Sequence, residues 1–199
     1  AADLGDPDAD IWKCYSGDEP LLPVVGVMVR LLLVGGGGAG KSRIINRVFT
    51  PLLRCYYGAR GLMKEAPSNN AARNINGETL HTANNFMVAQ SFRTTHLRPK
   101  ARDMPYVRRV SRLGSKVFDG FSMVNSRLFH ADAYRTAVCR AAAQREAHQH
   151  GSAARIDPTR YAERDHSWGS MPVVITGGDE LQFPCVPTAA GLLAPIEGT

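Results

Sequence analysis

Residues 31–48 read "LLLVGGGGAGKSRIINRV", an apolar run, a glycine-rich turn and a helix-periodic segment in direct succession. The stretch satisfies the pattern G-x-x-x-x-G-K-[ST], with Gly35, Gly40, Lys41 and Ser42 at the fixed positions. Glycines let consecutive backbone N–H groups turn toward one point, because no Cβ forbids positive φ. The positive end of the following helix strengthens such an anion site. The stretch therefore predicts a phosphate-binding loop between an interior strand and a helix.

Two side chains of this loop have defined chemistry. Lys41 is expected to reach the β- and γ-phosphate oxygens of a nucleotide, and the Ser42 hydroxyl to ligate Mg²⁺. The alternative is a glycine-rich turn that precedes a lysine by chance. The apolar run before the loop and the periodic run after it favour the phosphate site.

Composition limits the classes of protein that the chain can belong to. At 199 residues it suits one compact domain or at most two, and its net charge of +6 favours a polyanionic partner. The cysteines Cys14, Cys55, Cys139 and Cys185 are far apart and form no C-x-x-C pair. This spacing argues against a disulfide framework and a zinc site, and favours an intracellular location in cytoplasm or nucleus. No apolar run approaches the roughly 18 residues of a membrane span, so no membrane partner is expected.

Strands and helices are expected to alternate along the chain. Predicted strands are residues 29–34, 61–67, 115–123 and 171–178; predicted helices follow the loop and cover 68–75 and 125–148, with Ser68 and Asn125 as N-caps and a kink at Pro51. This order predicts an α/β fold, a parallel sheet with helices on both faces. Residues 1–28 are predicted to be an irregular acidic lead-in, and residues 29–199 a single P-loop domain.

The third predicted strand, "SKVFDGFSM" (residues 115–123), carries one acidic residue, Asp119. In phosphate-loop proteins such a residue assists Mg²⁺, which makes Asp119 the candidate. Hydrolysing members usually carry a glutamate next, which activates the attacking water, but this chain has Gly120. The alternative reading of Asp119 is a capping or turn residue at a strand end.

Polar residues also follow the last predicted strand, in "TGGDELQFPCVP" (residues 176–187). Asp179 and Gln182 stand at the carboxyl end of that strand, where ligands bind in open α/β sheets, and are candidates to sense a γ-phosphate. An Asp-containing turn closed by two prolines explains the same segment equally well.

Four segments in this order, "GGGGAGKS", "EAPSNNAARNINGETLHTA", "FDGFSM" and "GGDELQFPCVP", resemble the first motor domain of superfamily 1 DNA helicases. The nearest group is the Pif-type and RecD-like branch, and the resemblance covers roughly residues 30–199. It implies a RecA-like fold, the cofactors ATP and Mg²⁺, and translocation on single-stranded DNA. By position it implies phosphate binding by Gly38, Ala39, Gly40, Lys41 and Ser42, catalytic roles for Asp119 and Gln182, and DNA contacts by Pro67, Ser68, Asn69, Asn70, Thr79 and His81.

Three departures from the family pattern weaken the implied activity. Gly120 replaces the catalytic glutamate, the adenine-recognising glutamine upstream of the loop is missing, and the second RecA-like domain is absent from this chain. We therefore expect nucleotide binding, weak or absent hydrolysis, and no unwinding by this chain alone. Gly120→Glu is expected to raise any DNA-stimulated ATPase activity.

A basic run extends over residues 93–116 and is predicted to neutralise nucleic-acid phosphates. It contains Arg93, Arg98, Lys100, Arg102, Arg108, Arg109, Arg112 and Lys116. Phe92 and Tyr106 are candidates to stack on bases. A solvated loop without a ligand is the alternative.

Four functions stay open at this point. The first is an ATP-binding helicase-like domain; the second is an ATP-indifferent module that binds single-stranded DNA or RNA. A small P-loop phosphotransferase is the third, although "GGDELQFPCVP" has no role in that chemistry. The fourth is a product that folds without acting.

Overall fold

The computed structural model describes residues 28–86, 99–100, 103–149 and 167–179, and of residues 144–149 and 167 only the backbone. The predicted lead-in up to residue 27 lies outside the described residues, as do Phe92, Arg93, Arg98, Arg102 and Gln182.

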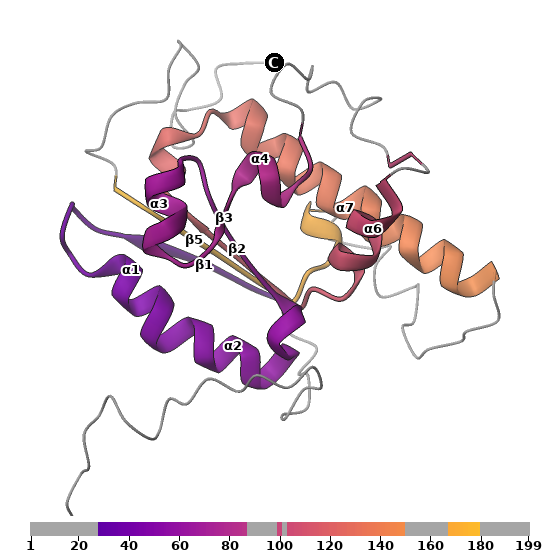
Figure 1. Cartoon of the computed structure of the whole chain (residues 1–199), viewed down its shortest axis with the longest axis horizontal. Coiled ribbons are helices and arrows are strands. Elements are labelled where there is room, and N and C mark those ends of the chain that lie inside the picture. Colours follow the sequence, from indigo (N-terminus) through magenta and orange to yellow (C-terminus); the bar gives the residue numbers. More distant parts are fainter. Residues whose placement is uncertain (1–27, 87–98, 101–102, 150–166, 180–199) are drawn as a thin grey trace, which may run out of the picture.

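The described chain alternates strands and helices in the predicted order (Figure 1). The strands are β1 (Val29–Val34), β2 (Leu62–Ala66), β3 (Glu78–Thr79), β4 (Ser115–Asp119) and β5 (Val173–Gly178). The helices are α1 (Lys41–Ile44), α2 (Thr50–Tyr57), α3 (Asn69–Asn74), α4 (Leu80–Ala83), α6 (Met104–Ser111) and α7 (Ser126–Gln149). Short 3-10 turns lie at Ala59–Gly61, Phe121–Met123 and Ser167–Gly169.

The strands form one parallel sheet in the order β1-β5-β4-β2-β3. Helices α1 and α2 lie on one side of it and α6 and α7 on the other (Figure 1). Alternate residues of β4 face these two layers: Val117 packs with Ile45 and Leu53, and Phe118 packs with residues of α4 and α7. The prediction of an α/β parallel sheet covered on both faces is confirmed.

Strand β1 differs from the prediction. Within the described residues it pairs with β5 alone and forms the edge of the sheet, so the expected interior strand is wrong for this part of the chain. Leu32 and Val34 are each 49% exposed. The apolar run predicted the strand correctly, since a run of this kind marks β-structure, but it does not specify how many neighbours the strand has.

Two helices begin at the side-chain caps that the sequence predicts. The Ser68 hydroxyl accepts a hydrogen bond from Ala71 N (3.3 Å), and Asn125 Oδ1 accepts one from Leu128 N (2.8 Å), so both N-caps are confirmed. Pro51 lies in the first turn of α2, directly after a π-helical turn at Ile45–Phe49. The helix is therefore irregular at the predicted place, because proline cannot donate the backbone hydrogen bond of a regular turn.

Elements β3, α4 and α6 were not predicted, and α6 lies inside the basic run. Tyr106, Val107 and Val110 form the buried face of α6. Among the described helices, none is both long and apolar enough to cross a membrane.

Candidate nucleotide-binding site

The glycine-rich loop connects β1 to α1 with a backbone that only glycine adopts readily. Gly38 has φ = 78° and Gly40 has φ = 85°, both in the left-handed region. Gly40 is the residue that caps α1, and Lys41 and Ser42 begin the helix. The loop therefore delivers both side chains to the carboxyl edge of the sheet, at the start of a helix.

Lys41 is folded back onto its own loop. Its ammonium donates to the carbonyl oxygens of Gly35 (2.5 Å) and Gly36 (2.8 Å). The two carbonyl oxygens thus accept the ammonium hydrogen bonds that phosphate oxygens would accept in a nucleotide complex. They hold the Lys41 side chain beside the loop.

Asp119 comes to this loop from the end of β4, across the intervening strand β5. The Ser42 hydroxyl lies 3.3 Å from Asp119 Oδ2 and donates to it. Burial raises the pKa of the Asp119 carboxyl above its usual value; the Ser42 hydroxyl, the Gly120 amide and the Lys41 ammonium act in the opposite direction. A hydroxyl beside a partly desolvated carboxylate is a donor set that suits Mg²⁺.

Loop and carboxylate line one pocket of about 330 Å³. Its lining residues are Gly37, Gly38, Ala39, Gly40, Lys41, Ser42, Arg43, Ala71, Asn74, Asp119, Gly120 and Met123. Arg43, Ala71, Asn74 and Met123 were not predicted. Arg43 follows Ser42 directly and could have been found from the motif, whereas the others reach the pocket only through folding.

Asp179 is buried at the end of β5 and faces the same loop. An ideal Cβ built on Gly37 would lie 3.8 Å from Asp179 Oδ2. Asp179 therefore stands beside the loop, as its place after a buried strand predicted, although it does not line the described pocket. Its partner in the prediction, Gln182, lies outside the described residues.

Gly120 has backbone angles φ = 83° and ψ = 38°, which glycine alone adopts without strain. A Cβ at this position would lie 3.1 Å from Cδ and from Cγ of Pro67. Glycine is therefore the residue that fits the backbone at position 120. Gly120→Glu must overcome this strain before any gain in ATPase activity appears.

The residues expected to contact DNA gather at one edge of the sheet. Pro67, Ser68, Asn69 and Asn70 directly follow β2, and Thr79 ends β3. The register of these two strands places Ala66 beside Thr79, so the segment after β2 and the end of β3 lie next to each other. Asn69 and Asn70 are exposed, whereas Ser68 and Thr79 are engaged as helix caps. His81 follows in α4 and is half-buried.

The basic run does not form one surface. Lys100, Arg108 and Arg109 are exposed, but Lys116 is fully buried and Tyr106 is 8% exposed. The predictions that Lys116 neutralises phosphates and that Tyr106 stacks on bases are therefore wrong. Every residue of β4 is buried, because helices cover both faces of the sheet, so Lys116 lies in the interior although it belongs to the basic run.

The exposed arginines line a second pocket, of about 570 Å³, near the beginnings of β2 and β4. Its lining residues are Ala59, Arg60, Leu62, Pro105, Arg108, Arg109, Arg112 and Leu113. Arg109 forms a two-point ion pair with Glu78, with N–O distances of 3.0 and 2.6 Å. Strand beginnings lie at the opposite edge of a parallel sheet from strand ends, so this pocket is separate from the glycine-rich loop.

The sheet order, the loop and the position of Asp119 together define a RecA-like α/β P-loop fold. The sequence matches no protein-family model and none of the curated proteins. Its fold is nevertheless similar to solved structures of Pif1 helicases. The Candida albicans Pif1 helicase aligns with a TM-score of 0.63 and 23% identity, over 83% of this chain and 32% of that chain.

Two Bacteroides structures give the same result. Pif1 in complex with ADP-AlF3 and ssDNA aligns with a TM-score of 0.55 and 20% identity, over 82% of this chain and 31% of that chain. Pif1 bound to ssDNA aligns with a TM-score of 0.54 and 18% identity, over 79% and 30%. The chain spans about a third of the length of these helicases. At such identities the likeness shows the fold, which is that of a part of the Pif1 helicases.

Proposed function

We propose that this chain is the ATP- and Mg²⁺-binding motor domain of a helicase-like protein that couples the binding of nucleotide to the binding of single-stranded DNA. The observation that carries this proposal is the pocket in which Lys41, Ser42 and Asp119 converge, with Ser42 Oγ 3.3 Å from Asp119 Oδ2. In this role the loop amides and Lys41 hold the phosphates, and Ser42 and Asp119 hold Mg²⁺. Asp179, beside Gly37, is proposed to sense the γ-phosphate, as is Gln182.

The proposed DNA contacts are the segment Pro67–Asn70 together with Thr79 and His81. Their common position at the carboxyl edge of β2 and β3 supports this assignment. A similarly folded Pif1 structure from Bacteroides is a complex with ADP-AlF3 and ssDNA. Gly120 of the nucleotide pocket lies next to Pro67 of the proposed DNA-contact segment, since a Cβ built on Gly120 would stand 3.1 Å from Cδ and Cγ of Pro67.

Hydrolysis by this chain is proposed to be weak or absent. Gly120 offers no carboxylate to orient or deprotonate water. Loss of a positioned general base commonly lowers a rate by about 10²–10⁴-fold. Binding depends on the loop and Lys41 instead, so it is retained.

Calorimetric titration of the chain with Mg·ATP tests the binding site. Lys41→Ala is expected to abolish the heat of binding, because no other lysine lines the pocket among the described residues. Lys100→Ala is the matched control, since Lys100 is exposed and does not line that pocket. Equal affinity of wild type and Lys41→Ala would overturn the assignment.

A second candidate function is a single-stranded nucleic-acid-binding module that ignores ATP. The pocket with Arg60, Arg108, Arg109 and Arg112 favours it, because several cations surround an apolar floor away from the loop. Guanidinium groups bind phosphates, and the floor accepts a base. In this function Arg98 and Lys100 extend the basic surface.

Fluorescence anisotropy of a labelled oligonucleotide, with and without a non-hydrolysable ATP analogue, separates the two functions. The motor domain is expected to change its DNA affinity with nucleotide, whereas the module is not. For the module, Arg108→Ala should weaken binding and reduce the salt slope by about one unit. Arg127→Ala, an equal loss of charge on an exposed part of α7, is the control.

A further inference from the structure

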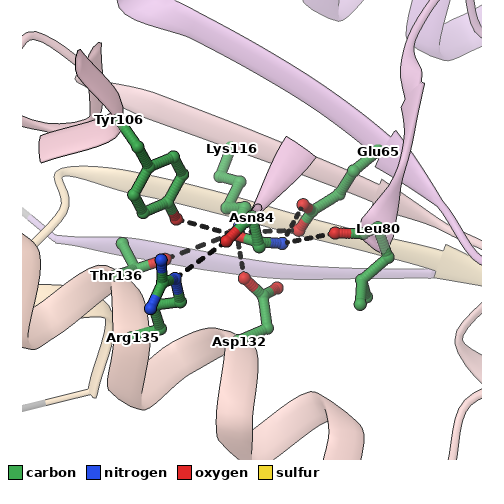
Figure 2. Close-up of polar contacts among 8 residues, drawn as sticks. All are labelled: Glu65, Leu80, Asn84, Tyr106, Lys116, Asp132, Arg135 and Thr136. Atoms are coloured by element: carbon green, nitrogen blue, oxygen red, sulfur yellow. Dashed lines mark hydrogen bonds and ion pairs between the residues drawn. The ribbon is translucent and has the colours of Figure 1, made fainter. Parts of the chain in front are cut away.

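A buried polar cluster lies between the sheet and α7, and the nucleotide site does not use it (Figure 2). Its side chains come from β2, α6, β4, α7 and the residue that directly follows α4: Glu65, Asn84, Tyr106, Lys116, Asp132, Arg135 and Thr136. Glu65, Lys116 and Asp132 are each 0% exposed. Charged groups in such a place must balance one another, since water does not reach them.

The charges of the cluster do not balance if every acid is ionised. Lys116 Nζ lies 2.9 Å from Glu65 Oε1 and also pairs with Asp132 Oδ1, so one ammonium faces two carboxyl groups. Arg135 forms an ion pair with Asp103 at 3.5 Å, so the charges of these two residues cancel and do not offset those around Lys116. Burial raises the pKa of the Tyr106 phenol well above its usual value and that of the Cys139 thiol to about 11, so both are neutral. One negative charge is in excess.

Hydrogen bonds connect the side chains of the cluster. An ammonium has three N–H donors, and those of Lys116 reach Asp132 Oδ1, Asn84 Oδ1 (3.2 Å) and Thr136 Oγ1 (3.4 Å). The Asn84 amide donates to Glu65 Oε2 (2.8 Å) and to the Leu80 carbonyl (3.1 Å).

Two further donors of the cluster reach Asn84. The Tyr106 hydroxyl donates to Asn84 Oδ1 at 2.8 Å, and Arg135 Nε donates to the Asn84 carbonyl at 2.8 Å. Asp132 Oδ2 is buried without a hydrogen-bond partner, and Glu65 Oε1 has only the Lys116 ammonium, 2.9 Å away, which Asp132 Oδ1 shares.

We infer that Glu65 keeps its proton at neutral pH, so that the cluster consists of an ammonium, a carboxylate and a carboxylic acid. One proton removes the excess charge and supplies a hydrogen-bond donor for Asp132 Oδ2, which has no partner otherwise. The pKa of Glu65 is raised well above its usual value, first by desolvation and then by the nearby Asp132 charge, although the Lys116 ammonium acts in the opposite direction. The direction agrees with a retained proton.

The proton acts at a place that links the two proposed ligand sites. Lys116 lies three residues before Asp119 on β4, and Glu65 lies two residues before Pro67. Glu65, Lys116 and Asp132 are thus positioning residues that fix β2 and β4 against α7. The proton count itself does not depend on nucleotide binding, so it stands even if the pocket binds no ATP.

Retention of a proton in the folded chain makes stability depend on pH. The raised pKa means that the stabilisation is complete below the pKa of unfolded glutamate, about 4.3, and is lost as pH rises toward the folded value. Over that window the folded chain carries one more proton than the unfolded chain. Its folding equilibrium constant then falls about tenfold for each pH unit.

Urea unfolding of the full chain between about pH 5.5 and about pH 7.5 tests this, with Glu65→Gln as the main variant. The glutamine amide replaces the protonated acid and donates to Asp132 without titrating. The ratio of wild-type to Glu65→Gln folding constants is expected to fall about tenfold per pH unit. Asp132→Asn removes the excess charge in the other way and should give the same ratio.

The matched control is Glu78→Gln, because Glu78 is the register partner of Glu65 on β3 but is 39% exposed. Its ratio to wild type should stay constant with pH. A constant ratio for both Glu65→Gln and Asp132→Asn would overturn the inference. If neither variant folds, the protons released on unfolding are counted by calorimetry in buffers of different ionisation heat. The protein used is Asp119→Asn, because the Asp119 carboxyl also has a raised pKa and would contribute to the count. Release of one proton near neutral pH supports the proton retained in the cluster, and release of none refutes it.

Discussion

Gly120→Ala is the most direct test of how the fold fixes the position after Asp119. The backbone there has φ = 83°, and placing an L side chain in the left-handed region costs about 1–2 kcal/mol. The new Cβ would lie 3.1 Å from Cδ and Cγ of Pro67, so Pro67 must move by a few tenths of an ångström. Lower entropy of the unfolded chain returns about 0.4–1 kcal/mol. We expect a net loss of about 1–3 kcal/mol in the free energy of unfolding.

Urea unfolding followed by circular dichroism measures this loss, and Gly36→Ala is the control. Gly36 lies in the glycine-rich loop after β1, its φ is not positive, and its Cβ would meet nothing within 4 Å. Gly36→Ala should therefore be close to neutral. If Gly120→Ala is no less stable than Gly36→Ala, the strain argument fails. In that case Gly120→Glu carries no structural cost, and its effect on ATPase activity reports the catalytic carboxylate alone.

Three further changes have defined outcomes. The raised pKa of Asp119 disfavours the ionised form of the carboxyl group that Mg²⁺ needs. Mg²⁺-dependent nucleotide affinity, measured by calorimetry, should therefore strengthen as pH rises. Asp119→Asn should remove this pH dependence, and an equal dependence in the variant would contradict the reasoning. Lys116→Met leaves two buried carboxyl groups without their ammonium and should cost about 3–5 kcal/mol in urea unfolding, whereas exposed Lys100→Met should cost almost nothing. Asn125→Ala removes the cap of α7 and should cost about 1 kcal/mol by the same assay; no loss would show that the Leu128 amide finds another acceptor.

Much of the fold followed from short-range information in the sequence. The glycine loop, the caps Ser68 and Asn125 and the apolar runs at 29–34 and 171–178 each depend on neighbours within a few residues. Elements of four residues or fewer, such as β3 and α4, were missed because so short a segment shows no periodicity. Helix α6 was missed because its arginines dominated the composition of the basic run, although Val107 and Val110 mark its buried face.

The sequence by itself determined the loop, its lysine and serine, and the acid at the end of the third predicted strand, because each is set by a local pattern. Only the tertiary structure decided that Ser42 meets Asp119 across 77 positions of the chain, that β1 is an edge strand in the described sheet, and that Lys116 points inward. Those outcomes depend on strand order and on which face each residue of β4 presents. Neither property is written in the pattern of any single segment, since both arise from pairing between strands that are far apart in sequence.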